Sequence, residues 1–600
     1  MLRERGERAE HREGERAAAA AKGLLSPLFV NRRHDVYEAG EDMARFYASK
    51  IFTDNWFGMM GNDPNENYAV TSGWAAAISL DPAAWHMAPG SARVTNAYGL
   101  MRSPWNAAND VRLLRSNATF GYYTAYTSAP RCSEFYKAMN VTDVVEFTKY
   151  AQANAHGAIH TLIGGVSNAD WKTLFEDVWG LDSDLAESLG LQGFGVIKDL
   201  WRAGVVTCPS DCAMEDALSS CSCTCPDYDS WDEKDAFSIL NKHSSNIPGL
   251  TFTAVMGTFE GQRMAKKFMS LVCGKMENYE SPFHGDAMNS GATADPTFWP
   301  VHPNVDRLFQ WRRLEGMTGT ETWPHGDLHG HEFYWGGGGE FSVKSCWGHQ
   351  PANHMIWKDL GFVNDPFATG YYYTVKDLWQ LNDPDAGHLP YTYPFFRWDA
   401  CAAEGYPSDL KWAGTVTDDD APLVNTRSTA EALTVSPPSL SEASSGFSIL
   451  VTDPQYPQPS SVTSGAYAWD AVFAPHREHD LEFVGPSLKG RPTITWTLSK
   501  KTTSDAGGTS FETVRSWEGE AVEPNTVLAT VAGCEHRLDA VDESGNSAST
   551  TFMSKHVRRE IRSLSDADRE GFLSAVASVY STPTKAGQER YGEDFLGGEW

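Results

Sequence analysis

Residues 295–306 read Asp-Pro-Thr-Phe-Trp-Pro-Val-His-Pro-Asn-Val-Asp, and the interpretation of the chain starts from this stretch. It places His302 directly before Pro303, a residue that suits the first turn of a helix. Upstream, His156 and His160 are four residues apart, so both imidazoles would leave the same face of a helix. Neutral imidazole nitrogen is a common ligand of transition-metal ions. The three histidines are therefore candidate ligands of a metal ion.

This stretch resembles the second-copper signature of the type-3 copper proteins, which are the tyrosinases, catechol oxidases and molluscan hemocyanins. The signature is matched without a gap by Asp295, Pro296, Phe298, Trp299, His302 and Asp306. The resemblance implies copper as the cofactor, with His156, His160 and His302 as its ligands and no catalytic residue beyond them. It also implies that Asp306 or Arg307 orients a ligand imidazole, because the second ring N–H of a ligand histidine usually has a partner.

The resemblance extends over roughly residues 95–400. Further segments similar to the family lie at 103–106, 132–137, 154–160, 346–349, 371–373 and 389–391. Two positions depart from the family pattern. Gly157 stands where tyrosinases often have an asparagine that orients a water, and Val301 stands where the family often has a first histidine before the ligand.

Only the second-copper half of the site is recognisable. No ligand set for a first copper precedes His156, although the family uses two coppers that share dioxygen. A glycine-rich region offers His325, His329 and His331 as a substitute, and solvent-exposed loop histidines are the alternative interpretation. His284 is a rival ligand in the segment before the signature.

The resemblance implies an oxidoreductase that acts on phenols or catechols with dioxygen. Its copper site would be incomplete, because the first copper site is not found. Two alternatives remain open: a hemocyanin-like oxygen-binding protein, and a non-catalytic binding module with a degenerate copper site. Residues 554–600 resemble the start of a further tyrosinase-like unit. A partner chain or a repeat could therefore supply the first copper site.

The chain has 600 residues and a formal net charge of −29. This charge disfavours nucleic acid as a partner, because phosphates attract a basic surface. It equally disfavours docking on an anionic membrane. No run of about 18 apolar residues is present, so we expect no membrane span.

Five of the ten cysteines are crowded into one segment, at Cys208, Cys212, Cys221, Cys223 and Cys225. The spacings differ from the paired C-x2-C pattern of zinc sites, which favours a disulfide-stapled loop over a thiolate cluster. Sequons at Asn117 and Asn140 and the clustered cysteines favour a secretory or extracellular lineage. The charged N-terminus lacks the apolar core of a signal peptide, so the compartment stays open.

We expect an α+β multidomain protein. A mainly helical tyrosinase-like copper domain, a partial helical bundle with long loops, is followed by an immunoglobulin-like β-sandwich and a terminal helix. The predicted segments are 1–40, a charged, disordered lead; 41–405, the copper-binding region with a cysteine-rich insertion at about 166–282; 406–439, a linker; 440–553, the sandwich; and 554–600, helical. Within the copper region, apolar spacing predicts a helix over 142–162 that ends at Gly164-Gly165, and a second over 185–201 that glycines interrupt.

Overall fold

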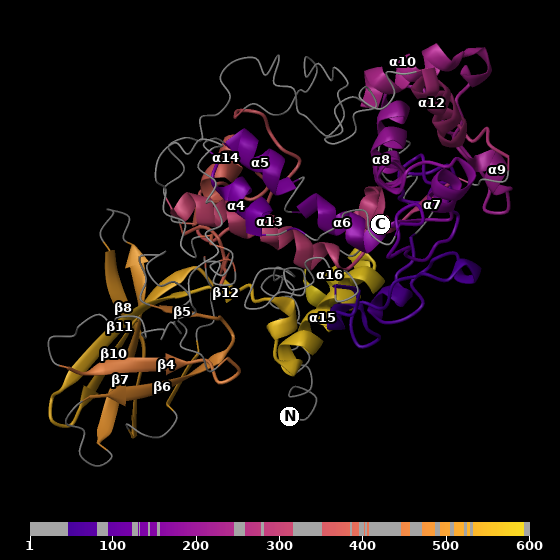
Figure 1. Ribbon diagram of the computed structural model, residues 1–600. Helices are drawn as coiled ribbons and strands as arrows, with labels where there is room; N and C mark the ends of the chain where they lie inside the picture. Colours follow the sequence, from indigo (N-terminus) through magenta and orange to yellow (C-terminus); the bar gives the residue numbers. More distant parts are fainter. Residues whose placement is uncertain are drawn as a thin grey trace. The chain divides into compact units, whose positions relative to one another are not determined.

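The structure is a computed structural model (Figure 1). It describes residues 46–592 except 81–93, 123–129, 131, 142–143, 153–155, 245–258, 278–280, 316–350, 385–386, 395, 397–400, 402–404, 407–445, 457–470, 486–491, 504–508, 521–524 and 529–531. The predicted lead at 1–40 and linker at 406–439 lie almost wholly outside these residues. The chain divides into two compact units, one formed mainly by residues 33–305 with 576–600, the other mainly by 306–323 with 347–575.

The first unit, which we call the metal unit, is mainly helical. Its described helices are η1 (Lys50–Phe52), η2 (Pro64–Glu66), η3 (Trp74–Ala77), α4 (Cys132–Met139), α5 (Val144–Gln152), α6 (Ala158–Gly164), α7 (Trp171–Thr173), the π-helix η7 (Leu174–Val178), α8 (Ser183–Arg202), α9 (Leu218–Cys221), η8 (Tyr228–Ser230), α10 (Glu233–Ser244), α12 (Phe259–Val272), η9 (Asp286–Met288) and η10 (Ser290–Ala294). The predicted helix over 142–162 is divided into α5 and α6, and α6 ends at Gly164 as expected.

Helix α8 runs uninterrupted through the glycines that were expected to weaken it. A methyl group at Gly190 would lie 2.4 Å from the Tyr122 ring, and one at Gly193 would lie 2.2 Å from the Trp171 ring. Both glycines therefore let the helix approach aromatic side chains of the core. Trp171 itself is buried and stacks on Phe120 with a ring-centroid distance of 3.8 Å.

The crowded cysteines form disulfides, as predicted. Cys208 pairs with Cys223, Cys212 pairs with Cys221, and Cys225 pairs with Cys273 of the segment after α12. These bridges indicate an oxidising environment of the secreted type.

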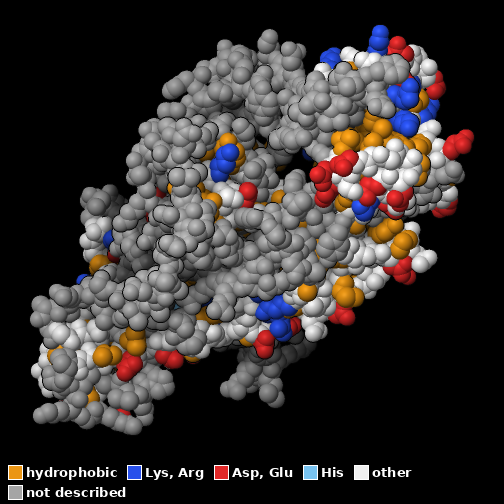
Figure 2. All heavy atoms as spheres, in the orientation of Figure 1, with side chains coloured by type: hydrophobic (Ala, Val, Ile, Leu, Met, Phe, Trp, Pro, Cys, Tyr) orange, Lys and Arg blue, Asp and Glu red, His pale blue; other side chains and the backbone are white. Residues whose placement is uncertain are grey.

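Over α10 and α12, Figure 2 shows acidic and basic side chains mixed with hydrophobic ones. Arg263 and Glu233 form an exposed ion pair of 3.8 Å here, and Lys275 and Asp229 form one of 3.6 Å. Exposed pairs contribute only about 0–1 kcal/mol each. The stability of this region therefore comes mainly from its disulfides and its apolar core.

Helix α13 (Phe298–Leu314) carries the signature histidine. The prediction that Pro303 lies in the first turn of the helix is wrong, because the helix begins five residues earlier. Pro303 has no N–H to donate to the carbonyl of Trp299, so one hydrogen bond of the helix is missing there. His302 consequently lies inside a helix and not before its start.

The second unit, which we call the sandwich unit, contains two β-sheets that share one core. Its strands are β3 (Tyr391–Thr392), β4 (Ser448–Thr452), β5 (Ala471–Phe473), β6 (Glu478–Val484), β7 (Thr493–Thr503), β8 (Thr509–Glu520), β9 (Asn525–Leu528), β10 (Cys534–Asp542), β11 (Ser547–Ser554) and β12 (His556–Val557). Among the described residues, one sheet has the order β5-β11-β10-β7-β8 and another the order β4-β6-β9. Their inward side chains, including Phe483, Trp496 and Phe552, form one shared core.

The other described helices are α14, η16 (Ile561–Ser563), α15 and α16. Helix α14 (Val375–Leu381) begins with a capping box in which the Thr374 and Asp377 side chains bond to each other's backbone N–H. Helices α15 (Asp566–Ser581) and α16 (Thr584–Tyr591) follow the sandwich. Among the described residues, no helix is both long enough and apolar enough to cross a membrane.

Candidate metal centre

His156, His160 and His302 converge through their Nε2 atoms. The Nε2–Nε2 distance is 2.7 Å between His156 and His160, and it is 3.2 Å from His302 to each of the other two. His156 lies in a π-helical turn directly before α6, His160 lies on α6, and His302 lies on α13. All three side chains are half-buried. The structure thus brings together the three residues that the sequence nominated.

The hydrogen bonds of the other ring nitrogens define the tautomers. Nδ1 of His156 is 3.2 Å from the carbonyl oxygen of Gln152, and Nδ1 of His160 is 2.5 Å from that of Ala287. A carbonyl oxygen can only accept, so each Nδ1 carries the proton. A neutral imidazole has a single N–H, and the two Nε2 atoms therefore face each other as bare lone pairs. Two facing lone pairs repel each other, and a cation bound by both nitrogens would remove that repulsion.

A proton is a poor candidate for that cation. Burial and, to a smaller extent, the neighbouring imidazoles lower the pKa of His156 to about 4 and that of His302 to about 3. Burial also lowers the pKa of His160. At neutral pH all three imidazoles are therefore uncharged, which is the form that binds a metal ion.

A close approach of two backbone segments places the Ala287 carbonyl beside His160. A methyl group at Gly285 would lie 1.9 Å from the Gly164 carbonyl oxygen, and the Gly285 N–H donates to the Gly165 carbonyl at 3.0 Å. Gly165 has φ 65°, a conformation that favours glycine. The glycine pair that ends α6 thus also allows η9 to approach the ligand helix.

A buried ion pair holds the start of α13. Arg115 donates to both oxygens of Asp295, at 2.7 Å each, and both side chains are fully buried. Burial alone would raise the pKa of Asp295, but Arg115 and the Thr297 N–H and hydroxyl outweigh it and hold that pKa below its usual value. The aspartate of the signature therefore anchors the segment that leads to His302.

A second buried ion pair holds the preceding segment. Arg102 Nε donates to Asp286 Oδ1 at 2.8 Å, and the Leu114 N–H donates to Asp286 Oδ2 at 2.7 Å. The sequence did not nominate Arg102, Arg115 or Asp286. The partners of each pair are at least 180 positions apart, so no local spacing connects them.

Phe298 forms an apolar wall of the site. Its ring stacks on His302 at a centroid distance of 3.7 Å and approaches His160 at 6.2 Å. The stacking restricts rotation of the His302 imidazole. It also places a hydrocarbon surface beside the point where the three Nε2 atoms meet.

The other nominated residues lie elsewhere. His284 is fully buried between Phe120 and Phe194, and neither of its ring nitrogens has a hydrogen-bond partner among the residues that the structure describes. Among the described residues, the group of converging ligand atoms that contains the three histidines does not include it. His325, His329 and His331 lie outside the described residues.

Asp306 and Arg307 were predicted to orient a ligand imidazole. The Asp306 carboxylate instead accepts hydrogen bonds within the sandwich unit, from Gln310 at 2.9 Å, Tyr391 at 3.0 Å and Tyr393 at 2.5 Å. Arg307 is buried, with its guanidinium carbon 5.7 Å from the centre of the Trp311 ring. For His156 and His160, the orienting partners are backbone carbonyls.

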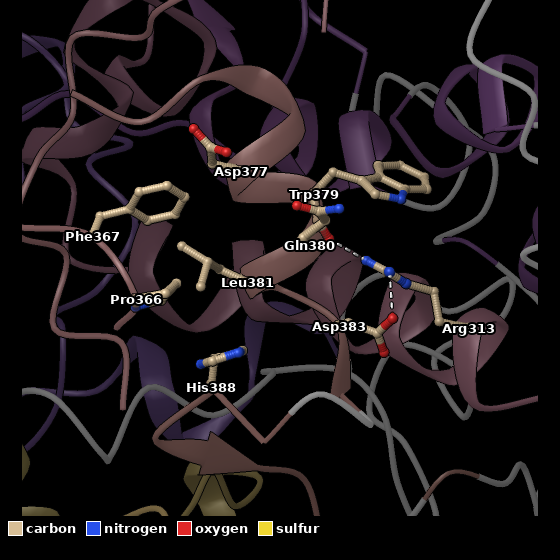
Figure 3. Close-up of a pocket in the computed structure, with 9 residues that line it drawn as sticks. All are labelled: Arg313, Pro366, Phe367, Asp377, Trp379, Gln380, Leu381, Asp383 and His388. Atoms are coloured by element: carbon tan, nitrogen blue, oxygen red, sulfur yellow. Dashed lines mark hydrogen bonds and ion pairs between the residues drawn. The ribbon is translucent and has the colours of Figure 1, made fainter. Parts of the chain in front are cut away.

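The sandwich unit has a separate pocket with a volume of about 490 Å³. Its walls include the apolar side chains of Phe367 and Leu381 (Figure 3). They also include the ion pair of Arg313 with Asp383, in which the nitrogen and oxygen are 2.7 Å apart. Arg313 also donates to the Trp379 carbonyl at 2.7 Å. The charges of the pair balance each other, so the ion pair adds no net charge to the pocket.

Comparison with known proteins leaves the candidate centre as the main evidence about function, because no family model, no curated protein and no solved structure matches the chain. The arrangement offers three neutral nitrogen donors on two scaffolded segments. Such a set can bind one transition-metal ion and leave a coordination position for another ligand.

Proposed function

We propose that His156, His160 and His302 bind copper, and that the chain is an oxidoreductase of the tyrosinase or catechol oxidase type. Its substrates are phenols or catechols together with dioxygen. The observation that carries the proposal is the approach of the two bare Nε2 atoms of His156 and His160 to 2.7 Å, with His302 completing the triangle. The resemblance of residues 295–306 to the second-copper signature supports copper among the metals that imidazole binds.

The residues present suit copper. Three neutral imidazoles are ligands that copper accepts, and their half-buried position gives access to a small reactant. Bound copper supplies one-electron redox chemistry and affinity for dioxygen. The protein holds the ligands through the Gln152 and Ala287 carbonyls, and Phe298 excludes water from one side. An aromatic substrate can pack against the same hydrocarbon surface.

Turnover of the family type also needs a second copper. Among the described residues, the one group of three histidines with converging nitrogens is His156, His160 and His302. We therefore propose that activity depends on a second ligand set, supplied by residues outside the described ones, by a repeat or by a partner chain. Copper binding to the triad does not depend on that second set.

The test is copper content per chain in purified protein, together with catechol oxidation. We expect His302→Ala to lose the triad copper, while His354→Ala, which removes an exposed histidine of the sandwich unit, keeps it. The copper site is supported if the wild type and His354→Ala contain copper and His302→Ala does not. Equal copper in His302→Ala and the wild type, or no copper in either, would overturn it. Catechol oxidation that needs the triad copper supports the oxidoreductase function, and copper binding without oxidation under any reconstitution contradicts it.

A further inference from the structure

The pocket of the sandwich unit has the size and the walls of a site for a small organic molecule. Its volume of about 490 Å³ lies within the range of about 300–1,000 Å³ that ligand sites occupy. Pro366, Phe367 and Leu381 supply apolar walls. In Figure 3 the ion pair of Arg313 with Asp383 lies across the pocket from Phe367. A ligand that matches both sides therefore has an apolar part and a charged part.

The guanidinium group of Arg313 is engaged by the protein itself. It donates to the Trp379 carbonyl and to Asp383, at 2.7 Å each, and its carbon atom lies 4.8 Å from the centre of the Trp379 ring. The Arg313 side chain is 4% exposed, whereas the Asp383 side chain is 32% exposed. A ligand in the pocket therefore meets the carboxylate of this ion pair and not its guanidinium.

Two further side chains of the pocket wall offer hydrogen-bond acceptors. Asp377 Oδ2 accepts from the Thr374 N–H at 2.8 Å and from the Tyr371 hydroxyl at 3.0 Å, while none of the described residues donates to its Oδ1. Nδ1 of His388 is 2.9 Å from the Val363 carbonyl oxygen and so carries the proton, which leaves a lone pair on Nε2 of the uncharged ring. Both side chains therefore suit a ligand that donates hydrogen bonds.

The charge of the pocket favours a cation. Among its described lining residues, Asp377 and Asp383 are carboxylates and Arg313 is the one lysine or arginine, which leaves an excess of one negative charge. The whole chain has a formal net charge of −29, and a field of this sign attracts cations.

We propose that this pocket binds a small organic cation, namely an amine whose ammonium group is attached to an apolar body. The ammonium group donates to the Asp383 carboxylate, and Asp377 and His388 Nε2 are its further acceptors. The apolar body packs against Phe367 and Leu381. The site shares no residue with the three histidines, so the inference does not rest on the proposed copper function.

The probe is 2-phenylethylamine, which has an ammonium group and an apolar ring but no phenol hydroxyl. 2-Phenylethanol is a neutral control of nearly the same shape, and phenylacetate is an anionic control. Calorimetric titration of the metal-free chain, with chelator present, should show one amine per chain and a Kd of about 1 mM or lower. Both controls should bind at least about tenfold more weakly, because they lack the charged donor. Equal affinities of the amine and the alcohol, or absence of saturable amine binding, would overturn the proposal.

A pair of matched variants locates the site. Asp383→Asn should weaken amine binding about tenfold or more, because it removes a charged acceptor. Asp539→Asn should leave amine binding unchanged, although Asp539 also pairs with an arginine and its side chain is similarly exposed, at 29%. Unchanged amine affinity in a folded Asp383→Asn protein would refute the assignment.

Gln380 covers the case in which Asp383→Asn does not fold, because Gln380 lines the pocket and is exposed. Gln380→Glu should strengthen amine binding and Gln380→Arg should weaken it, each roughly 2–5-fold, as expected for an exposed charge. Changes in the same direction would count against a cation site. His302→Ala should bind the amine as the wild type does. Copper and amine binding are measured separately, so each of the two proposals can fail alone.

Discussion

Trp299 and Tyr580 are 281 positions apart in the chain, yet the indole N–H of Trp299 donates to the Tyr580 hydroxyl oxygen at 2.6 Å. The same hydroxyl donates to the carbonyl of Thr293 at 2.6 Å. Trp299 lies one helical turn before His302, and Thr293 lies in η10, which leads into α13. Tyr580 on α15 therefore joins the C-terminal segment to the part of the metal unit that carries a candidate ligand.

Removal of this hydroxyl should destabilise the metal unit. In Tyr580→Phe, the Trp299 N–H and the Thr293 carbonyl both lose a partner in a half-buried place, and the expected loss is about 1–3 kcal/mol in the free energy of unfolding. Urea unfolding at pH 7 measures it. Tyr372→Phe is the control, because Tyr372 is 48% exposed and its change should stay within about 0.5 kcal/mol. Equal stability of the two variants would contradict the structural role of Tyr580.

The Arg115–Asp295 pair should be among the most sensitive positions of the chain. Asp295→Ala leaves the Arg115 charge buried without its counter-ion, and the expected loss is about 3–5 kcal/mol in the free energy of unfolding. Glu176→Ala removes a partner from the more exposed Lys172–Glu176 pair and should cost no more than about 1 kcal/mol. Chemical denaturation of both variants gives the comparison. Losses of similar size would show that the buried pair does not anchor α13.

His284 should make the stability of the metal-free protein depend on pH. Burial lowers its pKa in the folded protein to about 3, while the ordinary value is 6.5. Above pH 6.5 the His284 ring is neutral in both the folded and the unfolded chain, so its contribution to the free energy of unfolding is fully present. As the pH falls toward 3, only the unfolded chain binds the proton, and stability is lost.

His284→Leu, a change of similar volume, should therefore weaken the dependence of unfolding free energy on pH between 6.5 and about 3. Urea unfolding of both proteins across this range, with chelator present, is the measurement. Parallel curves for wild type and variant would show that His284 does not titrate in this way. Metal stoichiometry should be unchanged in the variant, since the His284 ring lies among Phe120 and Phe194.

Two helical glycines should respond in opposite directions to the same substitution. Gly193→Ala places a methyl group 2.2 Å from the buried Trp171 ring, so we expect destabilisation although alanine favours the helix. Gly571→Ala in α15 meets nothing within 4 Å and should stabilise by about 0.5–1 kcal/mol. Thermal unfolding of the two variants tests the contrast. A gain in stability in both variants would show that α8 can move away from Trp171.

The sequence predicted the three candidate ligands because their spacing and the signature are local patterns. His156 and His160 follow from helical periodicity, and the position of His302 follows from the residues around it. Arg102 and Arg115 could not be predicted in the same way, since nothing near them in the chain indicates which carboxylate each one meets. The helix start at Phe298 was missed because Pro303 normally marks a first turn, and α13 instead accepts a missing hydrogen bond.

By itself the sequence determined which residues could serve as ligands, that the crowded cysteines pair, and that a mainly helical part precedes a β-sandwich. These features depend on residue type and short-range spacing, which the chain carries whatever its tertiary fold. The tertiary structure alone decided that the His302 Nε2 lies 3.2 Å from those of His156 and His160, that the Ala287 carbonyl holds the His160 ring, and that Tyr580 reaches Trp299. Such relationships depend on distances between segments more than 100 positions apart, and those distances arise only when the buried ion pairs and the core pack together.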